Sequence, residues 1–357
     1  MIDPLDNIKA PVRRLRPYSL RWEPARVKLN QNENPWDLPI DVKQETFKRL
    51  SERAWSRYPA FVPSSLMERL AEFSGWTADG ILVGNGSNEL IQALLMATVG
   101  EGRQVLISEP TFTLYRQVVT VLGGEVVSVP LSPKLAYDVQ AMKTVIESLK
   151  PAVTIVCSPN NPTGCVMDER DLVSLLEASG GLIVVDEAYF EFTDETAVSL
   201  LKRHNNLVVL RTFSKAMALA ALRVGYMLTT PALAREISKA LLPYNLNLFS
   251  QTAAEVAIEM YDSRLKPLVK QILTERDRVH GALAGISGLE PVPSRANFIV
   301  VRSAVEPRRV FDALLERGIL IRDVSAYPML ADYFRIGIGT PEENDQLLDA
   351  LRSIFSA

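Results

Sequence analysis

The sequence has 357 residues and a formal net charge of −3; 47% of its residues are hydrophobic and 23% are charged. This balance is ordinary for a globular protein and gives no reason to expect nucleic acid as a partner. No apolar stretch is long enough to cross a membrane and no secretory signal is recognisable, so we expect a cytoplasmic protein without a membrane partner. The two cysteines, Cys157 and Cys165, and the two histidines offer no zinc-binding spacing, so no metal site is expected.

From residue 81 to residue 230, short runs rich in Val, Ile and Leu alternate with amphipathic stretches. These runs predict strands buried on both faces, because such strands show little polar alternation. They are Ile81–Val83, Val105–Ser108, Glu125–Val129, Val153–Cys157, Leu182–Asp186, Leu207–Arg211 and Gly225–Leu228. Helices are predicted between several of them, at Asn88–Val99, Thr111–Leu122 and Asp168–Ala178. The alternation predicts an α/β fold with a mostly parallel, seven-stranded sheet flanked by helices.

The last third of the chain has a different pattern. A long helical pattern from Pro243 to about Leu283 precedes strand-like segments at Asn297–Val301 and Phe334–Ile338, with a helix near Val310–Arg317 between them. We expect a smaller α+β domain here, completed by part of the N-terminal segment. The predicted division is therefore a large domain at residues 46–249 and a small domain formed by residues 1–45 and 250–357, with an N-terminal arm.

Polar residues directly follow the predicted strands, and ligands of parallel sheets bind beyond the carboxyl ends of the strands. Asp186 ends one of these strands, and a carboxylate at the end of a buried strand needs a positive partner. The protonated pyridine nitrogen of a cofactor would be such a partner, and its protonation would make the ring an electron sink. For Asp186 alone, a helix cap or a metal ligand is the alternative.

Lys215 follows the sixth predicted strand in the segment Thr-Phe-Ser-Lys, so its amine is expected over the same edge of the sheet. Thr212 and Ser214 could donate hydrogen bonds to a phosphate, and Arg223 could neutralise its charge. The alanine-rich residues 216–222 predict a helix after the lysine. Taken alone, the segment is more typical of an exposed lysine with two capping hydroxyls.

Three further segments also follow predicted strands. Ser158–Gly164 has the composition of a turn, but its Asn161 could hydrogen-bond the phenolic oxygen of a pyridine cofactor. Gly84–Glu89 places small residues before a helix whose first backbone amides could bind a phosphate. Phe112 could stack on the pyridine ring or pack in the core.

Together and in this order, these segments resemble the fold-type I pyridoxal-phosphate enzymes, the aspartate aminotransferase superfamily. Further segments are similar to one class II family within it, histidinol-phosphate aminotransferase, and the resemblance runs from about Tyr18 to Asn344. These segments are LNQNENP at 29–35, RYP at 57–59, VDEAYFEF at 185–192, RTFSKA at 211–216, LRVGY at 222–226, PYNLN at 243–247, ANF at 296–298, GILIR at 318–322 and FRIGIGT at 334–340.

The resemblance implies a role for each matching residue. Lys215 would bind pyridoxal 5′-phosphate covalently and then move the proton during catalysis. Asp186 would pair with the pyridine nitrogen, Asn161 and Tyr189 would hold the phenolic oxygen, and Phe112 would stack on the ring. The residues implied for the phosphate are Ser87, Asn88, Thr212, Ser214, Arg223 and, across the interface of a homodimer with shared active sites, Tyr58 of the partner subunit.

The resemblance also implies how the substrates bind. Arg335 and Arg322 would hold their anionic groups, and Tyr18 and Asn32 would line the substrate pocket. An arginine fork can meet a carboxylate or a phosphate, which suits a site that takes glutamate in one half-reaction and histidinol phosphate in the other. The reaction implied is ping-pong amino transfer between these two amines and their keto partners, 2-oxoglutarate and imidazole acetol phosphate, in histidine biosynthesis.

Two enzyme classes remain as alternatives: another amino-acid aminotransferase, for example one for aromatic substrates, and a lyase such as threonine-phosphate decarboxylase. A regulator built on this fold would need a DNA-binding domain, for which we expect no room in the chain. The sequence departs from the family at Ala218 and Ala221, where relatives typically have glycine. The two methyl groups favour a helix by about 1 kcal/mol each and would crowd a close backbone approach.

Overall fold

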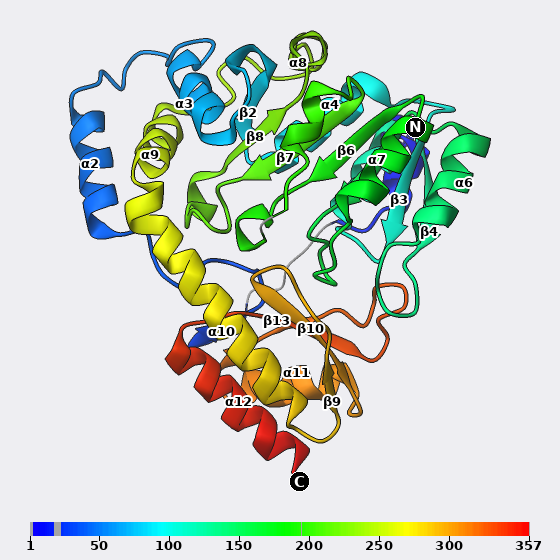
Figure 1. Cartoon of the computed structure of the whole chain (residues 1–357), viewed down its shortest axis with the longest axis vertical. Helices are drawn as coiled ribbons and strands as arrows, with labels where there is room; N and C mark the ends of the chain where they lie inside the picture. The colour runs from blue at the N-terminus through cyan, green and yellow to red at the C-terminus, as the bar shows by residue number, and fades with distance from the viewer. Residues whose placement is uncertain (1–2, 18–22, 194, 357) are drawn as a thin grey trace.

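The computed structural model describes residues 3–17, 23–193 and 195–356. Its largest element is a seven-stranded sheet with the strand order β2-β8-β7-β6-β5-β3-β4 (Figure 1). The strands are β2 (Ile81–Asn85), β3 (Gln104–Glu109), β4 (Glu125–Pro130), β5 (Val153–Cys157), β6 (Leu182–Asp186), β7 (Leu207–Thr212) and β8 (Val224–Leu228). β8 runs antiparallel to both of its neighbours, whereas the other pairs are parallel. The predicted α/β fold with a mostly parallel sheet is confirmed.

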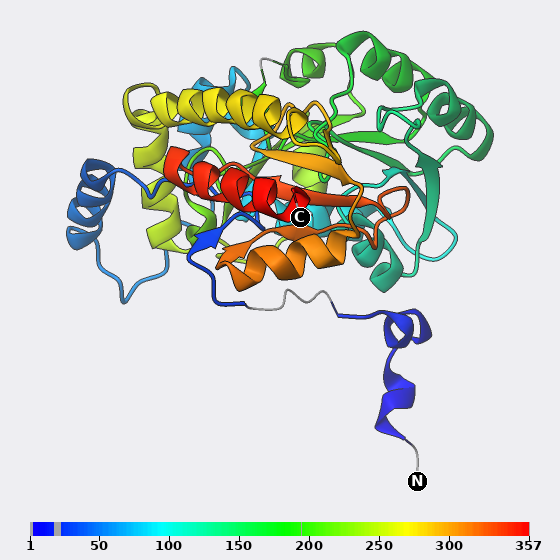
Figure 2. The same cartoon turned by 90° about the horizontal axis from the view of Figure 1, so that it is seen from below.

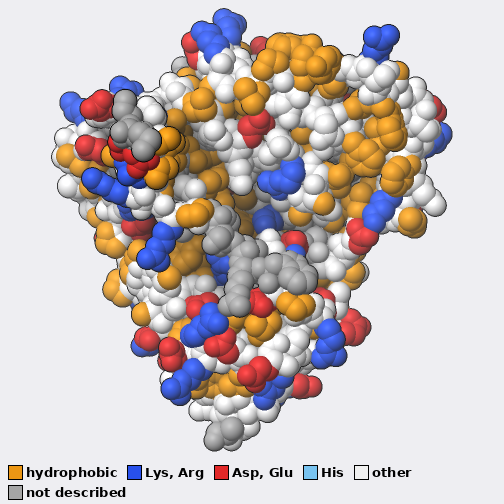
Figure 3. Space-filling view, turned by 180° about the vertical axis from the view of Figure 1, so that it is seen from behind, with side chains coloured by type: hydrophobic (Ala, Val, Ile, Leu, Met, Phe, Trp, Pro, Cys, Tyr) orange, Lys and Arg blue, Asp and Glu red, His pale blue; other side chains and the backbone are white. Residues whose placement is uncertain are grey.

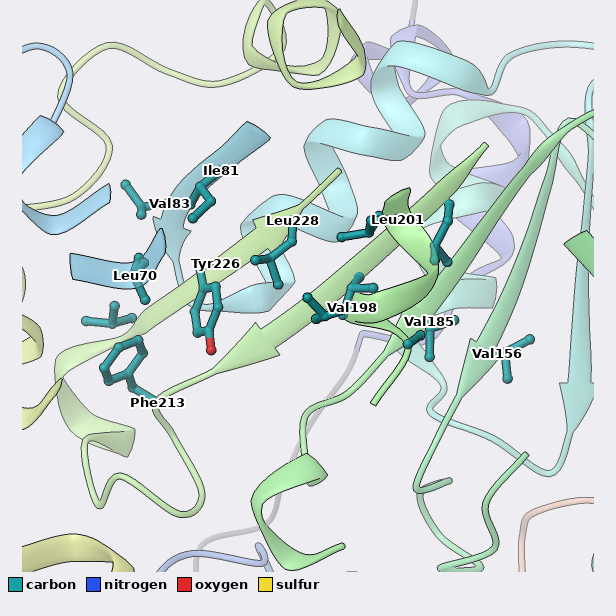
Figure 4. Close-up of a cluster of buried hydrophobic side chains, with 14 of the residues drawn as sticks. Leu70, Ile81, Val83, Val156, Val185, Val198, Leu201, Phe213, Tyr226 and Leu228 are labelled. Atoms are coloured by element: carbon teal, nitrogen blue, oxygen red, sulfur yellow. The ribbon is translucent and has the colours of Figure 1, made fainter. Parts of the chain in front are cut away.

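Helices cover both faces of this sheet. One layer contains α4 (Ser87–Thr98), α5 (Leu114–Leu122) and α8 (Pro231–Ser238). The other contains α2 (Ile40–Ser51), α3 (Ser64–Ser74), α6 (Val139–Leu149), α7 (Glu169–Ala178) and α9 (Leu248–Glu259). Successive residues of a strand point to opposite faces, so Val184 of β6 packs in the first layer and Val185 in the second. Figure 4 shows part of the second core, where Leu70, Val185 and Tyr226 are labelled.

A second, antiparallel sheet lies at the other end of the molecule (Figure 1), with the order β12-β13-β10-β9. Its strands are β9 (Leu289–Pro291), β10 (Phe298–Ser303), β12 (Arg322–Asp323) and β13 (Tyr333–Gly337). Three helices pack with it, namely α10 (Lys266–Ala284), α11 (Pro307–Glu316) and α12 (Pro341–Phe355). The N-terminal segment joins this part, because β1 (Val27–Lys28) pairs in parallel with β11 (Ile319–Leu320).

Each sheet has its own hydrophobic core. Val42 of α2 and Val256 of α9 pack on the core of the large sheet, whereas Val269 of α10 and Leu347 of α12 belong to the core of the small sheet. A division into two domains at residues 46 and 249 stays a prediction. The packing of Val42 and Val256 favours boundaries that leave both residues in the large domain.

The long helical pattern from Pro243 to Leu283 is not one helix. Residues 243–247 form a loop, and α9 begins after Asn247, whose side chain accepts a hydrogen bond from the backbone N–H of Ser250. A π-helical turn at Tyr261–Leu265 then separates α9 from α10. An N-cap of this kind provides a partner for a free backbone amide at the start of a helix. The helical periodicity of the sequence alone did not predict this cap, and so it did not predict where α9 begins.

The predicted helix at residues 216–222 is wrong. Ala218 has a φ of +54° and Arg223 a φ of +52°, both in the left-handed region, and a short 3-10 helix at Ala220–Leu222 lies between them. The backbone N–H of Leu219 bonds the carbonyl of Phe213, which turns the segment back on itself. This turn brings the Arg223 guanidinium to the Ser214 hydroxyl, so tertiary contacts override the helix propensity of the alanines.

The first described residues protrude from the body of the molecule (Figure 2) and contact it at α5. They form a 3-10 helix at Pro4–Asn7 and α1 (Ala10–Arg14), and Lys9 donates a hydrogen bond to the carbonyl of Val121 at the end of α5. Further 3-10 helices lie at Ala78–Gly80, Phe190–Phe192 and Val198–Lys202. Within residues 3–17, 23–193 and 195–356, no helix combines the length and apolar character that a membrane crossing needs.

Candidate active site

A cavity of about 320 Å³ lies between the two sheets, at the carboxyl ends of several strands of the large sheet. Figure 3 shows a hollow between the wider and the narrower part of the molecule, with basic side chains inside it. Most residues that the sequence singles out line this cavity: Asn32, Ser87, Asn88, Phe112, Asn161, Asp186, Tyr189, Thr212, Ser214, Lys215, Arg223, Arg322 and Arg335. The fold therefore collects residues from nine separate segments into one site.

Asp186 is buried at the end of β6, with 3% of its surface exposed. The hydroxyl of Tyr115 donates to its Oδ2 at 2.6 Å, and the backbone N–H of Ala188 donates to its Oδ1 at 3.1 Å. Burial raises the pKa of this carboxyl to about 6, although both hydrogen bonds act in the opposite direction. The chain thus stabilises the charged carboxylate by two hydrogen bonds, and among the described residues no lysine or arginine forms an ion pair with it.

Lys215 lies on the loop after β7, and its Nζ donates to the carbonyl of Gln31 at 2.9 Å. Burial and the positive charges of Arg335 and Arg223 lower the pKa of this amine from its usual value to about 8. A substantial fraction of Lys215 is therefore neutral near pH 7 to 8. A neutral amine can act as a nucleophile or accept a proton, which an ordinary surface lysine rarely does.

One corner of the cavity is built for an anion. The first turn of α4 points its free backbone amides at this corner, starting with Ser87, and a helix N-terminus favours negative charge. A Cβ atom at Gly225 would overlap the backbone nitrogen of Ser87, so glycine permits the close approach of β8 to α4. The Arg223 guanidinium donates to the Ser214 hydroxyl at 3.0 Å, and the Thr212 hydroxyl donates to the same oxygen at 3.0 Å.

The middle of the cavity carries hydrogen-bonding groups and one aromatic ring. Asn32 donates through Nδ2 to the Tyr189 hydroxyl at 3.0 Å, and Asn161 accepts a hydrogen bond from Arg335 through Oδ1. The Oδ1 atom of Asn32 is buried and has no hydrogen-bond partner in the described part of the chain. The Phe112 ring borders the cavity next to these groups. A buried acceptor without a partner is costly, so this region is suited to a ligand that donates.

Two arginines face the cavity from the small sheet. Arg322 of β12 and Arg335 of β13 are directly opposite each other in the antiparallel register, which places their side chains on one face. Arg335 is only 6% exposed and donates through Nη2 to the carbonyl of Asn30 at 2.8 Å. Like charges directly opposite each other are destabilising, so an anion between the two guanidinium groups would relieve their repulsion.

Of the predicted site residues that the structure describes, Tyr58 is not part of this cavity. Tyr58 is 80% exposed and stacks on Tyr244, with ring centroids 4.5 Å apart, on a different surface of the chain. Tyr18 lies outside the described residues. The structure of one chain therefore does not bring Tyr58 together with the other predicted residues.

Sequence reasoning missed several residues that line the cavity: Asn30, Gln31, Tyr115, Cys157, Ala188 and Tyr327. Tyr115 could have been found, because it lies three residues after Phe112 at the start of a predicted helix, and residues at this spacing share a face. Gln31 and Ala188 take part through backbone groups, for which residue type gives no signal.

Comparison with known proteins shows the family of the chain. The family model "Aminotransferase class I and II" matches residues 25–351. The histidinol-phosphate aminotransferase of Chlorobaculum parvum is 41% identical over 92% of both chains, and histidinol-phosphate aminotransferase 1 of Carboxydothermus hydrogenoformans is 40% identical over 96% of both. Among solved structures, histidinol-phosphate aminotransferase from Sinorhizobium meliloti in complex with pyridoxal-5′-phosphate has a TM-score of 0.85 and 26% identity, over 93% of this chain and 92% of that one. The chain thus belongs to the class I and II aminotransferases and, within them, to the histidinol-phosphate aminotransferase family.

Proposed function

We propose that this protein is a histidinol-phosphate aminotransferase that uses pyridoxal 5′-phosphate to move an amino group between histidinol phosphate and 2-oxoglutarate in histidine biosynthesis. The observation that carries the proposal is one cavity that holds a buried carboxylate, Asp186, a lysine with a lowered pKa, Lys215, and two arginines from a second sheet. These are the groups that amino transfer between anionic substrates requires.

The residues present fit the cofactor. Asp186 has no cationic partner among the described residues and would gain one in a protonated pyridine nitrogen. The anion corner would hold the phosphate through Ser87, Asn88, Thr212, Ser214 and Arg223. Tyr189 and the Nδ2 group of Asn161 would donate to the phenolic oxygen, and Phe112 would stack on the ring. When bound, the cofactor supplies the electron sink for the reaction.

Lys215 binds the cofactor covalently and is the proton carrier in this proposal. Its Nζ must be neutral to take the proton from the substrate Cα, and burial next to Arg335 and Arg223 lowers the pKa of the amine toward that state. The bond to the carbonyl of Gln31 orients Nζ before reaction. Asp186 acts through its charge, because a carboxylate at the ring nitrogen keeps that nitrogen protonated.

Arg335 and Arg322 bind the acidic groups of both amino donors. A planar guanidinium can form paired hydrogen bonds with a carboxylate of glutamate or with the phosphate of histidinol phosphate. Asn32 lines the substrate side of the cavity, and Tyr18 is proposed to lie there as well. The opposed arginines explain how one site can accept two amines that differ in size and share an anionic group.

The proposal includes a cytoplasmic homodimer with shared active sites. Tyr58 lies in a group of exposed apolar side chains together with Trp55, Phe61 and Val62. Exposed apolar groups of this kind are typical of protein interfaces, and a two-fold partner would place its own Tyr58 near the phosphate of this chain. Analytical ultracentrifugation at micromolar concentration should find a dimer; a monomer that is fully active would contradict this part.

The visible absorption spectrum tests the function directly. The purified protein with pyridoxal 5′-phosphate should show the band of lysine-bound cofactor, and glutamate or histidinol phosphate, each added to a fresh sample, should convert it to the amine form of the cofactor. If only glutamate or an aromatic amino acid does so, the cofactor and reaction class stand and the substrate assignment is wrong. If no band of bound cofactor forms, the proposal fails as a whole.

A further inference from the structure

Asp186 is held from two sides by donors of the chain itself. Tyr115 donates to Oδ2 at 2.6 Å and the backbone N–H of Ala188 donates to Oδ1 at 3.1 Å, so each carboxylate oxygen has one fixed partner. Two bonds to different oxygens define the rotation of the carboxylate plane about its Cβ–Cγ bond. A carboxylate accepts about four hydrogen bonds, so each oxygen keeps capacity for a ligand in the cavity that Asp186 lines.

Tyr115 is itself rigidly placed. Its side chain is 0% exposed in the core between α5 and the sheet, beside Val119 of the same helix. The Phe112 ring meets the Tyr115 ring edge to face, with centroids 5.6 Å apart and planes at 89°, and the backbone N–H of Tyr115 bonds the carbonyl of Phe112 at 3.3 Å. One turn at the start of α5 therefore carries both the ring proposed to stack on the cofactor and the hydroxyl that holds Asp186.

We propose that Tyr115 is a positioning residue, whose hydroxyl orients the Asp186 carboxylate toward the pyridine nitrogen of the cofactor and keeps it charged. The inference rests on the proposed function, because it needs a pyridine cofactor next to Asp186. It extends the site by a residue that acts through Asp186. A hydrogen bond to a charged group in a buried site is among the stronger ones, so its loss should be measurable.

Other titratable groups surround Asp186, and a pH-dependent change can be assigned to Asp186 only if these groups do not titrate in the same pH range. Burial raises the pKa of the thiol of Cys157 on β5 and of the phenols of Tyr137 and Tyr189, so these groups stay neutral at neutral pH. Glu187, the first residue after β6, is paired with Arg211 at 2.9 Å. Lys215 lines the same cavity and has a pKa of about 8, above the range in which Asp186 titrates. The phosphate of a bound cofactor also titrates at about pH 6, in every variant alike, so the difference in pH dependence between the wild type and a Tyr115 variant reports on Asp186.

The test uses Tyr115→Phe and pyridoxamine 5′-phosphate, a form of the cofactor that cannot react with Lys215. Equilibrium dialysis of the cofactor-free protein gives the dissociation constant at each pH. The variant should bind about tenfold more weakly at neutral pH. The Tyr115 bond lowers the pKa of Asp186, so without it the carboxyl takes up its proton at higher pH, and the loss of affinity on acidification should begin at higher pH than in the wild type.

The matched control is Tyr226→Phe. Tyr226 is also a buried phenol, 1% exposed, but it lies in the core on the other face of the sheet, where its hydroxyl accepts a long hydrogen bond from Arg211. This variant should keep the wild-type dissociation constant and the wild-type pH dependence. A double-mutant cycle is a second test. In an Asp186→Asn background, Tyr115→Phe should change the affinity for pyridoxamine 5′-phosphate less than twofold.

Each result decides the question. If Tyr115→Phe has the affinity and pH dependence of the wild type, or weakens binding equally in the Asp186→Asn background, the hydroxyl does not act through Asp186 and the proposal is overturned. A Tyr115→Phe protein that does not fold overturns it too, because the hydroxyl is then a requirement of the fold. If wild type and Tyr226→Phe both fail to bind the cofactor, the proposed function fails first.

Discussion

The two sides of the cavity bring their side chains together by different means. On the large-sheet side, Asp186 and Lys215 follow parallel strands, and the carboxyl ends of parallel strands lie at one edge of a sheet. On the small-sheet side, Arg322 and Arg335 lie within antiparallel strands and meet because the register puts them opposite each other. The direction of the strands places Asp186 and Lys215 together, whereas the register of strand pairing places Arg322 and Arg335 together.

This difference matches a division of tasks in the proposed function. The large-sheet side would hold the cofactor and move the proton, which every amino donor needs. The small-sheet side would bind the anionic group of the substrate, which sets the choice of donor. Variants on the first side should therefore lower turnover with all substrates, and variants on the second should mainly raise KM.

The largest expected effect is on the large-sheet side. Lys215→Ala should lower kcat for transamination by at least about 10⁴-fold, because it removes both the covalent link and the proton carrier. Cofactor binding should persist through Asp186 and the phosphate corner, and dialysis measures this. Lys239→Ala, at an exposed lysine paired with Glu236, is the control and should have wild-type kcat. Near-normal transamination by Lys215→Ala would contradict the assignment.

A conservative change on the small-sheet side should separate binding from chemistry. Arg335→Lys keeps the charge and removes the planar fork, so KM for histidinol phosphate should rise about 10- to 100-fold, with cofactor affinity within threefold of wild type. Steady-state kinetics measures KM and dialysis the cofactor. Arg302→Lys, at an exposed arginine of β10 in the same sheet, should leave both values unchanged. A loss of kcat without a change in KM would break the proposed division between the two sides.

The pH dependence of cofactor attachment links the two sides, because Arg335 helps to lower the pKa of Lys215. The amine reacts only when neutral, so the rate of covalent attachment should rise about tenfold per pH unit below about 8 and level off above it. An ordinary lysine would give a rate that still rises at pH 10. Stopped-flow absorbance at a series of pH values decides between these curves.

The smallest effect concerns the loop that joins Lys215 to Arg223. Ala218 has a left-handed φ of +54°, which costs a residue with a Cβ roughly 1–2 kcal/mol, while glycine gains freedom in the unfolded chain. Ala218→Gly should thus stabilise the protein by up to about 1 kcal/mol in urea unfolding. Ala221→Gly serves as the comparison, because Ala221 lies in a short 3-10 helix and should gain nothing. Equal effects of both variants would show that backbone conformation is not the cause.

Much of the large-sheet side could be predicted from the sequence. Buried strands have a clear composition, and the polar residue after each one, such as Asp186 or Lys215, must lie at the ligand-binding edge if the sheet is parallel. The small-sheet side could not be derived in this way. Short strands such as β12 give no periodic signal, and the pairing of Arg322 with Arg335 depends on a register that local sequence does not determine. Those two residues were predicted from the family resemblance alone.

Other errors have a common physical cause. The alanine-rich residues 216–222 have a high helix propensity, but the bond from Leu219 to Phe213 and the bond from Arg223 to Ser214 hold a turn in their place. Tyr115 was not predicted as a site residue, because its hydroxyl contacts Asp186 from a helix that lies 71 positions away in the sequence. Propensity and composition describe neighbours along the chain, whereas both of these features are made by neighbours in space.

The pairing of β1 with β11 has a consequence for how the protein matures. Val27 can form its strand partnership only after Ile319, far along the chain, has been synthesised. Contacts between such distant positions form slowly, because a long loop must close first. Gln31 and Asn32 lie a few residues after β1 and border the cavity, so this wall of the cavity depends on the pairing of β1 with β11. The cavity is therefore complete only when two segments from distant parts of the chain have paired.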